Sequence, residues 1–308
     1  MIAYLNGTFL PLEDARLPVW DYGFTMGVAI SEQIRTYHGR LPLLKFHLER
    51  LSEGMEIVGI KPEIAVSEIG QRVHQVVEKN LSALTSGNDL SIGIVVTPGD
   101  QTNRAPLTPS MLRSFTLLIT ALPLPCHTWA QDYENGIELI TAETREIPSE
   151  CLPKALKCRS RMHYYLAEQQ ARRQSPLAKA LLLDLRGFVA EGTIASVLAV
   201  RDQTIVAPPE TQVLPSVSVR FLETQLCPAA GIPFQRTELT VSDLLTADEV
   251  WWLSTSSCML PVASINGHAI GSTDNRQLYS KFISSWSTKM DVDIVQQAIR
   301  NRDQQLGG

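Results

Sequence analysis

Lys157 is the residue of this sequence that is best placed for covalent chemistry. It stands just before a segment that reads as a helix, because apolar residues recur there at helical spacing, at Met162, Tyr165, Leu166 and Ala167. Arg159 and Arg161 crowd it, and an amine held near positive charge and partly out of water loses proton affinity. A neutral amine can attack a carbonyl and form a Schiff base. Taken alone, such a stretch is more often the solvated, basic start of a helix with no role in catalysis. The assignment of Lys157 therefore depends on the rest of the chain.

Length and composition exclude several classes of protein. The 308 residues suffice for one large domain or two ordinary ones. The formal net charge is -5 and no run of like charges stands out, so we expect neither nucleic acid nor a membrane as a partner. We find no apolar run of transmembrane length and no signal-peptide core. The 5 cysteines form no CxxC pair and the 6 histidines show no ligand spacing, which predicts reduced thiols in a cytoplasmic protein without a metal.

The first part of the chain mixes strand and helix signals. Asn6-Gly7 between two apolar runs predicts a hairpin. Further strands are predicted at 31–37, 91–97 and 115–122, and helices from Pro42 onward and at 64–81. The glycine-punctuated residues 21–27 are expected to form a loop that lets Phe24 reach a substrate pocket. The polar, proline-rich residues 99–110 are expected to form a mobile loop near a site.

The helix from Pro42 carries an arginine with two possible roles. His47 and Arg50 are three residues apart and therefore face the same way. An arginine beside a core stripe is usually a surface group whose stem covers apolar atoms. It is otherwise a clamp for phosphate, because its planar fork matches phosphate oxygens.

A proline-rich break at 122–125 divides the chain. We expect an N-terminal α/β domain at 1–122, a linker at 123–127 and a C-terminal domain at 128–308. Strands are predicted in the second domain at 137–141, 180–185, 188–190, 196–200, 204–207 and 250–253, with helices at 219–226 and through the tail at 276–305. The short spacing of the strands favours an antiparallel or mixed, barrel-like sheet, and the fold class is α/β (α+β).

Four features that are far apart in the sequence contain chemical groups that could bind the same ligand. They are Lys157, the turn Glu191-Gly192-Thr193, the helix start Val217-Ser218, and the turn Ser254-Thr255. A phosphate ester suits two hydroxyl-bearing turns, a helix N-terminus and an arginine. A carboxylate at a strand end can keep a ring nitrogen protonated, and a lysine can hold an aldehyde. Together these residues describe a site for pyridoxal 5′-phosphate.

On these residues the chain resembles the fold-type IV pyridoxal-phosphate enzymes, or class IV aminotransferases. This family includes branched-chain aminotransferase, D-amino-acid aminotransferase and aminodeoxychorismate lyase. The resemblance runs from Tyr4 to about Gly267, through Tyr4-Leu5-Asn6-Gly7, Asp21-x-Gly-Phe-x-x-Gly27, His47-Leu-Glu-Arg-Leu51, Glu191-Gly192-Thr193, Leu214-Pro215-Ser216-Val217-Ser218, and Thr246-Ala247-Asp248-Glu249-Val250 with Ser254-Thr255. It implies two domains, the second larger and barrel-like, and a homodimer.

The resemblance also implies roles. Lys157 forms the internal aldimine and moves the substrate proton, and Glu191 pairs with the pyridine nitrogen. The phosphate is held by Arg50, Val217, Ser218, Ser254 and Thr255, and the substrate is met by Phe24, Arg159, Arg161 and Ser256. Lys154 lies three residues before Lys157 and competes for the assignment, but the spacing to the helix end favours Lys157.

The chain departs from the family pattern at several positions. Ser216 replaces a glycine, Ser160 an asparagine, and Cys258 a glutamate, while Arg161 stands where branched-chain enzymes bring a tyrosine. Thr97-Pro98-Gly99 replaces the carboxylate trap of the D-amino-acid enzymes. We therefore expect an aminotransferase that moves an amino group from a branched-chain-like L-amino acid to a 2-oxo acid. The alternatives are a lyase forming 4-aminobenzoate and pyruvate, and a non-catalytic binding protein, which the retention of Lys157, Glu191 and Arg50 disfavours.

Overall fold

The computed structural model describes residues 1–84, 87–100, 115–271 and 276–306. The chain forms two compact units: Met1–Leu124 with Ala155–Ser160, and Pro125–Lys154 with Arg161–Gly308. The sequence placed 155–160 in the second domain. Backbone hydrogen bonds explain the difference, because Ser31 N donates to Lys157 O at 2.8 Å and Arg159 N donates to Ala29 O at 2.9 Å. Each unit is described by itself.

The first unit is built on an antiparallel sheet with the order β2-β1-β5-β4-β3. The strands are β1 Ile2–Leu5, β2 Thr8–Pro11, β3 Ile30–Arg35, β4 Leu90–Thr97 and β5 Thr116–Pro123. These bounds confirm the strands expected from the sequence to within a few residues. The hairpin is also confirmed: Asn6 and Gly7 take φ values of 45° and 95°, which the turn requires and which asparagine and glycine tolerate best.

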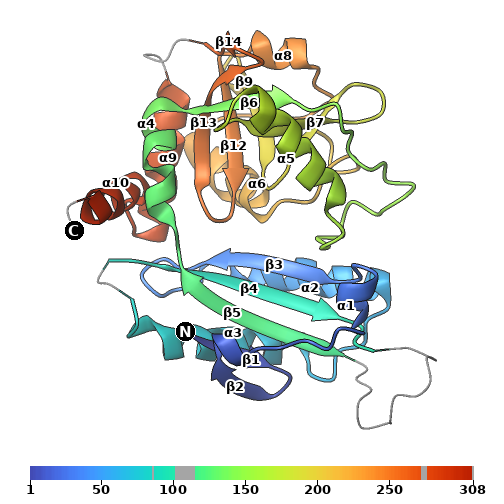
Figure 1. The fold of residues 1–308 in the computed structure, drawn as a ribbon. Helices are drawn as coiled ribbons and strands as arrows, with labels where there is room; N and C mark the ends of the chain where they lie inside the picture. The colour runs from blue at the N-terminus through green and yellow to red at the C-terminus, as the bar shows by residue number, and fades with distance from the viewer. Residues whose placement is uncertain (85–86, 101–114, 272–275, 307–308) are drawn as a thin grey trace. The chain divides into compact units, whose positions relative to one another are not determined.

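Two helices, α2 Leu44–Val58 and α3 Val66–Leu81, pack against this sheet and against each other (Figure 1). Apolar residues of α2, α3 and the strands form one buried cluster that includes Leu51, Val73 and Ile94. The α2 helix ends at Gly59, whose φ of 77° is the left-handed conformation that glycine favours at a helix end. Both helices confirm the predicted ones, although α2 begins two residues after Pro42.

The expectation of a loop at 21–27 is wrong in part, because a short helix, α1 Tyr22–Thr25, lies within it. Asp21 caps this helix by accepting a hydrogen bond from Gly23 N at 2.6 Å. The other carboxylate oxygen of Asp21 accepts from the hydroxyls of Thr97 and Thr116, each at 2.9 Å. The segment that carries Phe24 is therefore fixed to β4 and β5. Before it lies a single 3-10 turn, η1 Leu12–Asp14.

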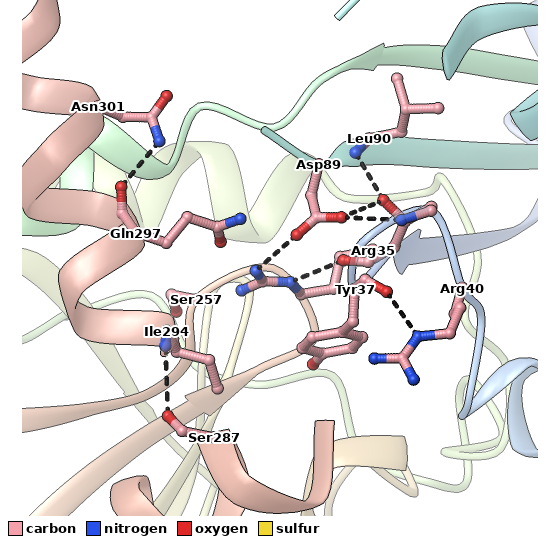
Figure 2. Close-up of polar contacts among 12 residues, drawn as sticks. Arg35, Tyr37, Arg40, Asp89, Leu90, Ser257, Ser287, Ile294, Gln297 and Asn301 are labelled. Atoms are coloured by element: carbon pink, nitrogen blue, oxygen red, sulfur yellow. Dashed lines mark hydrogen bonds and ion pairs between the residues drawn. The ribbon is translucent and has the colours of Figure 1, made fainter. Parts of the chain in front are cut away.

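A buried ion pair ties the end of β3 to the start of β4. Arg35 Nη2 lies 3.7 Å from Asp89 Oδ2, and both side chains are almost fully buried (Figure 2). The guanidinium also stacks over the ring of Tyr37, 4.5 Å from its centroid. Thr36 Oγ1 donates to Asp89 Oδ1 at 2.7 Å. Since burying either charge alone would be costly, this pair fixes where β3 turns.

The second unit contains a curled nine-stranded sheet with the order β11-β10-β9-β12-β13-β6-β7-β8, and β14 pairs with β13. The strands are β6 Ile137–Thr141, β7 Lys179–Leu183, β8 Val189–Gly192, β9 Ser196–Arg201, β10 Thr204–Ala207, β11 Phe234–Arg236, β12 Glu249–Ser254, β13 Cys258–Ile265 and β14 His268–Ala269. The sheet mixes parallel and antiparallel pairs. Strand β8 stands at one end of the order yet contacts β9, so the sheet curls. This confirms the mixed, barrel-like sheet expected from the sequence.

Helices cover this sheet (Figure 1). Helix α5 Met162–Gln174 packs on β6 and β7, and α9 Gln277–Met290 packs on β12 and β13. Shorter elements are η3 Cys126–Trp129, α4 Ala130–Asn135, α6 Val217–Phe221, the π-helical turn η4 Leu222–Leu226, α7 Cys227–Ala230 and α8 Val241–Leu245. On α5, only Ala167 and Ala171 are buried, whereas Met162, Tyr165 and Leu166 are exposed. The apolar pattern of this helix therefore marks a surface.

The tail is helical, as expected for 276–305, and it forms two helices. Helix α9 ends at Asp291, whose φ of 56° is left-handed. Helix α10 Ile294–Leu306 follows, and Ile294 N donates to Ser287 Oγ at 3.3 Å across the junction (Figure 2). Within the described residues, none of the helices has both the length and the apolar character needed to span a bilayer. Most of the loop expected to be mobile, from 101 to 110, lies outside the described residues.

Candidate active site

Lys157 is held in the first unit by a strand-like pairing with residues that lead into β3. Its carbonyl oxygen accepts hydrogen bonds from Ser31 N at 2.8 Å and from Ser31 Oγ at 3.3 Å. The next residues continue the pairing: Cys158 forms a bridge with Ile30, and Ser160 Oγ donates to Gly27 O at 2.9 Å. The lysine backbone is therefore fixed to a sheet of the first unit, although its position in the sequence lies near α5.

Arg50 on α2 belongs to a buried group of charged or titratable residues with Glu32 and His47. Its Nε and Nη2 donate to the two oxygens of Glu32, at 2.8 and 2.7 Å. His47 Nδ1 lies 2.7 Å from Glu32 Oε2, and His47 is completely buried. Burial raises the pKa of Glu32, but the charge and hydrogen bonds of Arg50 outweigh it and hold that pKa at about 2. Glu32 is therefore ionised, and it fixes the plane of the guanidinium.

His47 lies close enough to Arg50 and Lys157 for both positive charges to act on its imidazole. Burial lowers the pKa of His47, and the positive charges of Arg50 and Lys157 lower it further against the opposing effect of Glu32. The imidazole is neutral, with Nδ1–H directed to Glu32. Its Nε2 is buried and has no hydrogen-bond partner among the described residues. Lys157, His47 and Arg50 thus form one local group in the first unit.

Glu191 is the central residue of the second unit's group. It lies on β8 and only 5% of it is exposed. One carboxylate oxygen accepts a short hydrogen bond from the hydroxyl of Tyr164, and the other accepts from Leu214 N at 3.3 Å. Burial raises the pKa of Glu191, and the nearby charge of Glu146 adds to the effect. Both hydrogen-bond donors to this carboxylate are neutral.

The glycine that follows Glu191 is required by packing. A Cβ atom built on Gly192 would lie 2.1 Å from the ring of Trp252 on β12. Any other residue would push β8 away from β12. Thr193 completes the turn, and its hydroxyl donates to Glu168 Oε2 at 2.9 Å. Gly192 and Thr193 therefore each have a structural reason in this turn.

The predicted phosphate cup is the start of α6. Ser216 caps the helix by accepting a weak hydrogen bond from Val219 N at 3.4 Å, and Val217 and Ser218 are buried in its first turn. The first N–H groups of a helix lack intrahelical acceptors and attract anions. Because Leu214 N reaches Glu191, the cup lies next to that carboxylate.

The second hydroxyl-bearing turn lies between β12 and β13. Ser254 and Ser257 are hydrogen-bonded through their hydroxyls at 2.8 Å, and Thr255 and Ser256 form the half-buried turn between them. Helix α6 contacts β12, which ends in this turn. The start of α6 and the turn at Ser254-Thr255 therefore belong to elements that adjoin each other, and Leu214 connects the start of α6 to Glu191.

Lys154 has a different environment from Lys157. Its ammonium donates to Glu146 Oε1 at 2.7 Å and to the carbonyl of Ile147. Glu146 is buried, and His163 Nε2 lies 3.5 Å from its other oxygen. Burial raises the pKa of Glu146, but His163 and Lys154 outweigh it and lower the pKa overall. Lys154 is thus part of a buried ion pair in the second unit.

The expected substrate residues are distributed over the two units. Phe24 is 75% exposed on α1 and Arg159 is exposed, both in the first unit. Arg161 belongs to the second unit, where its guanidinium lies 6.0 Å from the centroid of the Tyr164 ring. Ser256 lies in the turn after β12.

Several residues around these groups were not expected from the sequence. Glu32, Tyr164, Glu146 and His163 all contact an expected residue or a neighbour of one. No clear sequence signal marked Glu32, because its strand, Ile30–Arg35, carries polar residues at four of six positions. The position of Tyr164 two residues after the start of α5 gave no signal either.

The chain is similar to known proteins over most of its length. A family model described as amino-transferase class IV matches residues 29–265. A Methanocaldococcus jannaschii protein named "Putative branched-chain-amino-acid aminotransferase" is 30% identical over 278 residues, covering 90% of this chain and 91% of the relative. The D-alanine aminotransferase of Bacillus licheniformis is 27% identical over 272 residues, or 88% and 91% of the two chains.

The fold is also found among solved structures. The branched-chain amino acid aminotransferase from Escherichia coli superposes with a TM-score of 0.79 at 23% identity, covering 92% of each chain. The chain belongs to the class IV aminotransferases. Members of this family are pyridoxal-phosphate enzymes. The relatives do not favour the lyase considered from the sequence.

Proposed function

We propose that this chain is a pyridoxal-phosphate-dependent aminotransferase that moves the amino group of a branched-chain-like L-amino acid to a 2-oxo acid. The observation that carries this proposal is the state of Glu191. A buried carboxylate is costly unless a cation or several hydrogen bonds compensate it. Glu191 receives two neutral donors, while a carboxylate offers about four acceptor sites. A protonated ring nitrogen would supply both the missing charge and a further donor.

The surroundings of Glu191 also suit the phosphate end of the cofactor. We assign the phosphate to the first turn of α6, at Val217 and Ser218, with the Ser254-Thr255 turn beside it. These groups offer backbone N–H donors and hydroxyls, which bind phosphate oxygens well. Arg50 is proposed as the charged partner, because its guanidinium is held in one plane by Glu32.

When bound, pyridoxal phosphate supplies a ring that accepts electrons from the substrate Cα. The chain's own residues do the remaining work. Lys157 Nζ would hold the cofactor and, as a free amine, would move the proton at the substrate Cα. Glu191 keeps the proton on the ring nitrogen. The strand-like pairing at Ser31 limits how far the Lys157 backbone can drift, so the amine works from a fixed position.

The substrate proposal rests on the named relatives and on one local contact. Relatives of this chain include proteins named as branched-chain and as D-alanine aminotransferases. The D-amino-acid enzymes place a carboxylate trap where this chain has Thr97-Pro98-Gly99. Here Thr97 Oγ1 donates to Asp21, and Gly99 N donates to Thr97 Oγ1 at 3.0 Å. Thr97 therefore fixes the segment that carries Phe24 and does not form a carboxylate trap. This difference from the D-amino-acid enzymes favours an L-amino acid as substrate, and we propose that it is met by Phe24, Arg159, Arg161 and Ser256.

The substrate is tested by single-turnover spectroscopy. Purified protein is loaded with pyridoxal phosphate and its visible absorption is followed after adding L-leucine, D-alanine or L-glutamate. We expect L-leucine to convert the cofactor to its aminated form, and 2-oxoglutarate to reverse the change. Conversion by D-alanine alone would overturn the stereochemical part of the proposal. A protein that binds no pyridoxal phosphate would overturn the whole of it.

The attachment point is tested by reduction with borohydride and peptide mass spectrometry. We expect the cofactor mass on the peptide that contains Lys157 and none on Lys154, which is occupied by Glu146 and Ile147. In Lys157→Ala the label should disappear. The matched control is Lys154→Ala, which should lose stability but keep the label. A label on Lys154 in the wild-type protein would refute the assignment.

We also propose a homodimer. Met162, Tyr165 and Leu166 lie on one face of α5 and are 71, 62 and 48% exposed. Three neighbouring apolar side chains on a helix are more typical of a protein interface than of a free surface. Light scattering after gel filtration should give twice the chain mass of 34.1 kDa. A monomer at micromolar concentration would contradict the proposal.

A further inference from the structure

Tyr164 links two carboxylates in the second unit. It lies in the first turn of α5, and its hydroxyl donates to Glu191. Its ring stacks on that of His163, with centroids 4.1 Å apart. His163 in turn lies 3.5 Å from Glu146, which is paired with Lys154. The groups around Tyr164 are therefore Glu191, Glu146, His163 and Arg161.

The phenol of Tyr164 acts as a donor. Burial raises its pKa well above the usual value, and the charges of Glu191 and Glu146 raise it further, while Arg161 lowers it. The hydroxyl therefore keeps its proton at neutral pH and gives the hydrogen bond to Glu191. A hydrogen bond to an ionised group is about twice as strong as one between neutral groups.

Two opposing influences act on Glu191. Burial and the charge of Glu146 raise its pKa and so favour the protonated form. The hydrogen bond from Tyr164, the charge of Lys154 and the hydrogen bond from Leu214 N favour the carboxylate form. If Glu191 took up the proton itself, a bound ring nitrogen would lose it. Tyr164 is the only side chain that donates to Glu191 among the described residues.

We propose that Tyr164 is a positioning residue for Glu191: its hydroxyl holds the carboxylate ionised and correctly oriented, so that the proton resides on the ring nitrogen of the cofactor. This inference rests on the proposed function, because it concerns how Glu191 meets pyridoxal phosphate. It adds a residue that contacts Glu191, not the substrate. No bond is made or broken by Tyr164, and its own proton stays on the phenol oxygen.

The test uses Tyr164→Phe, with Tyr279→Phe as the matched control. Tyr279 is a buried tyrosine on α9 of the same unit, and its hydroxyl donates to Met259 O at 3.3 Å, so the same substitution removes a hydrogen bond away from Glu191. Apoprotein of each variant is titrated with pyridoxal phosphate, and the cofactor labelled with nitrogen-15 in the ring reports protonation by NMR. We expect Tyr164→Phe to bind the cofactor about tenfold more weakly, since the lost hydrogen bond involves an ionised group. Its ring-nitrogen signal should move toward the unprotonated position, whereas Tyr279→Phe should match the wild type.

A double-mutant cycle shows whether Tyr164 acts through Glu191. In a Glu191→Gln background, Tyr164→Phe should have little further effect on cofactor affinity. Thermal unfolding of each apoprotein checks that the variants are folded. The inference would be overturned if Tyr164→Phe weakened cofactor binding equally in the wild-type and Glu191→Gln backgrounds. It would also be overturned if the ring-nitrogen signal were unchanged in Tyr164→Phe. Either result would leave the proposed function intact. Failure of the wild type to bind pyridoxal phosphate would overturn both.

Discussion

Replacing Glu32 by glutamine should strongly destabilise the first unit. Glu32 is fully buried and receives both a bidentate pair from Arg50 and a contact from His47. Glutamine keeps the shape but removes the negative charge that the buried guanidinium of Arg50 faces. Breaking a buried ion pair from one side costs about 3–5 kcal/mol. The lowered pKa of Glu32, about 2 against 4.5, gives a similar figure of about 3 kcal/mol by linkage.

The same reasoning fixes the direction of the pH dependence. Because the pKa of Glu32 is lower in the folded protein, its ion pair stabilises the fold fully above pH 4.5. That contribution is lost progressively as the pH falls from 4.5 toward 2. The wild type should therefore lose more stability between pH 5 and 3 than the Glu32→Gln variant, which has no carboxylate to protonate at this position.

Urea unfolding followed by circular dichroism measures both effects. The matched control is Glu53→Gln, an exposed glutamate on α2 whose change should stay within about 0.5 kcal/mol. A loss in Glu32→Gln of less than about 1 kcal/mol at pH 7, or a pH dependence identical to that of the wild type, would refute the reasoning. Either result would mean that Arg50 finds another counter-charge without cost.

Three further substitutions test separate parts of the second unit by thermal unfolding. Gly192→Ala would place a methyl group 2.1 Å from Trp252 and should cost about 1–3 kcal/mol; an unchanged melting temperature would show that the two strands can separate freely. Glu249→Ala removes a buried carboxylate that accepts from three N–H groups, two of them at the start of α9, and should cost at least about 2 kcal/mol. Thr240→Ala removes the capping box with Asp243 on α8 and should cost about 1 kcal/mol, with Thr240→Ser retaining most of the stability.

Local signals in the sequence predicted the features that depend on neighbouring residues. The hairpin at Asn6-Gly7 and the helix start after Ser216 are examples, because each depends on a turn or cap formed within a few residues. The curled sheet of the second unit could also be expected, since short strands at close spacing fit few other folds.

Features that depend on distant pairing could not be predicted in this way. The segment around Lys157 pairs with residues more than a hundred positions earlier, so its place in the first unit has no local sign. On α5 the periodic apolar residues identified a helix, but periodicity cannot tell a buried face from an exposed one. His47 and Arg50 were correctly placed on one side of a helix, yet only the fold shows that this side faces Glu32.

The two buried glutamates argue most directly that Glu191 serves a ligand. Glu32 and Glu191 are both almost entirely buried, so burial raises the pKa of each. The pKa of Glu32 nevertheless falls to about 2, because Arg50 is bonded to it, whereas that of Glu191 stays raised because its bonded partners are neutral. A carboxylate that only supported the fold would gain from a cation like that of Glu32. The second unit instead surrounds Glu191 with a phenol, a backbone N–H and the carboxylate of Glu146. The charge of Lys154, which is paired with Glu146, lowers the pKa of Glu191 without offsetting the rise. This environment favours a positive charge brought by a bound molecule.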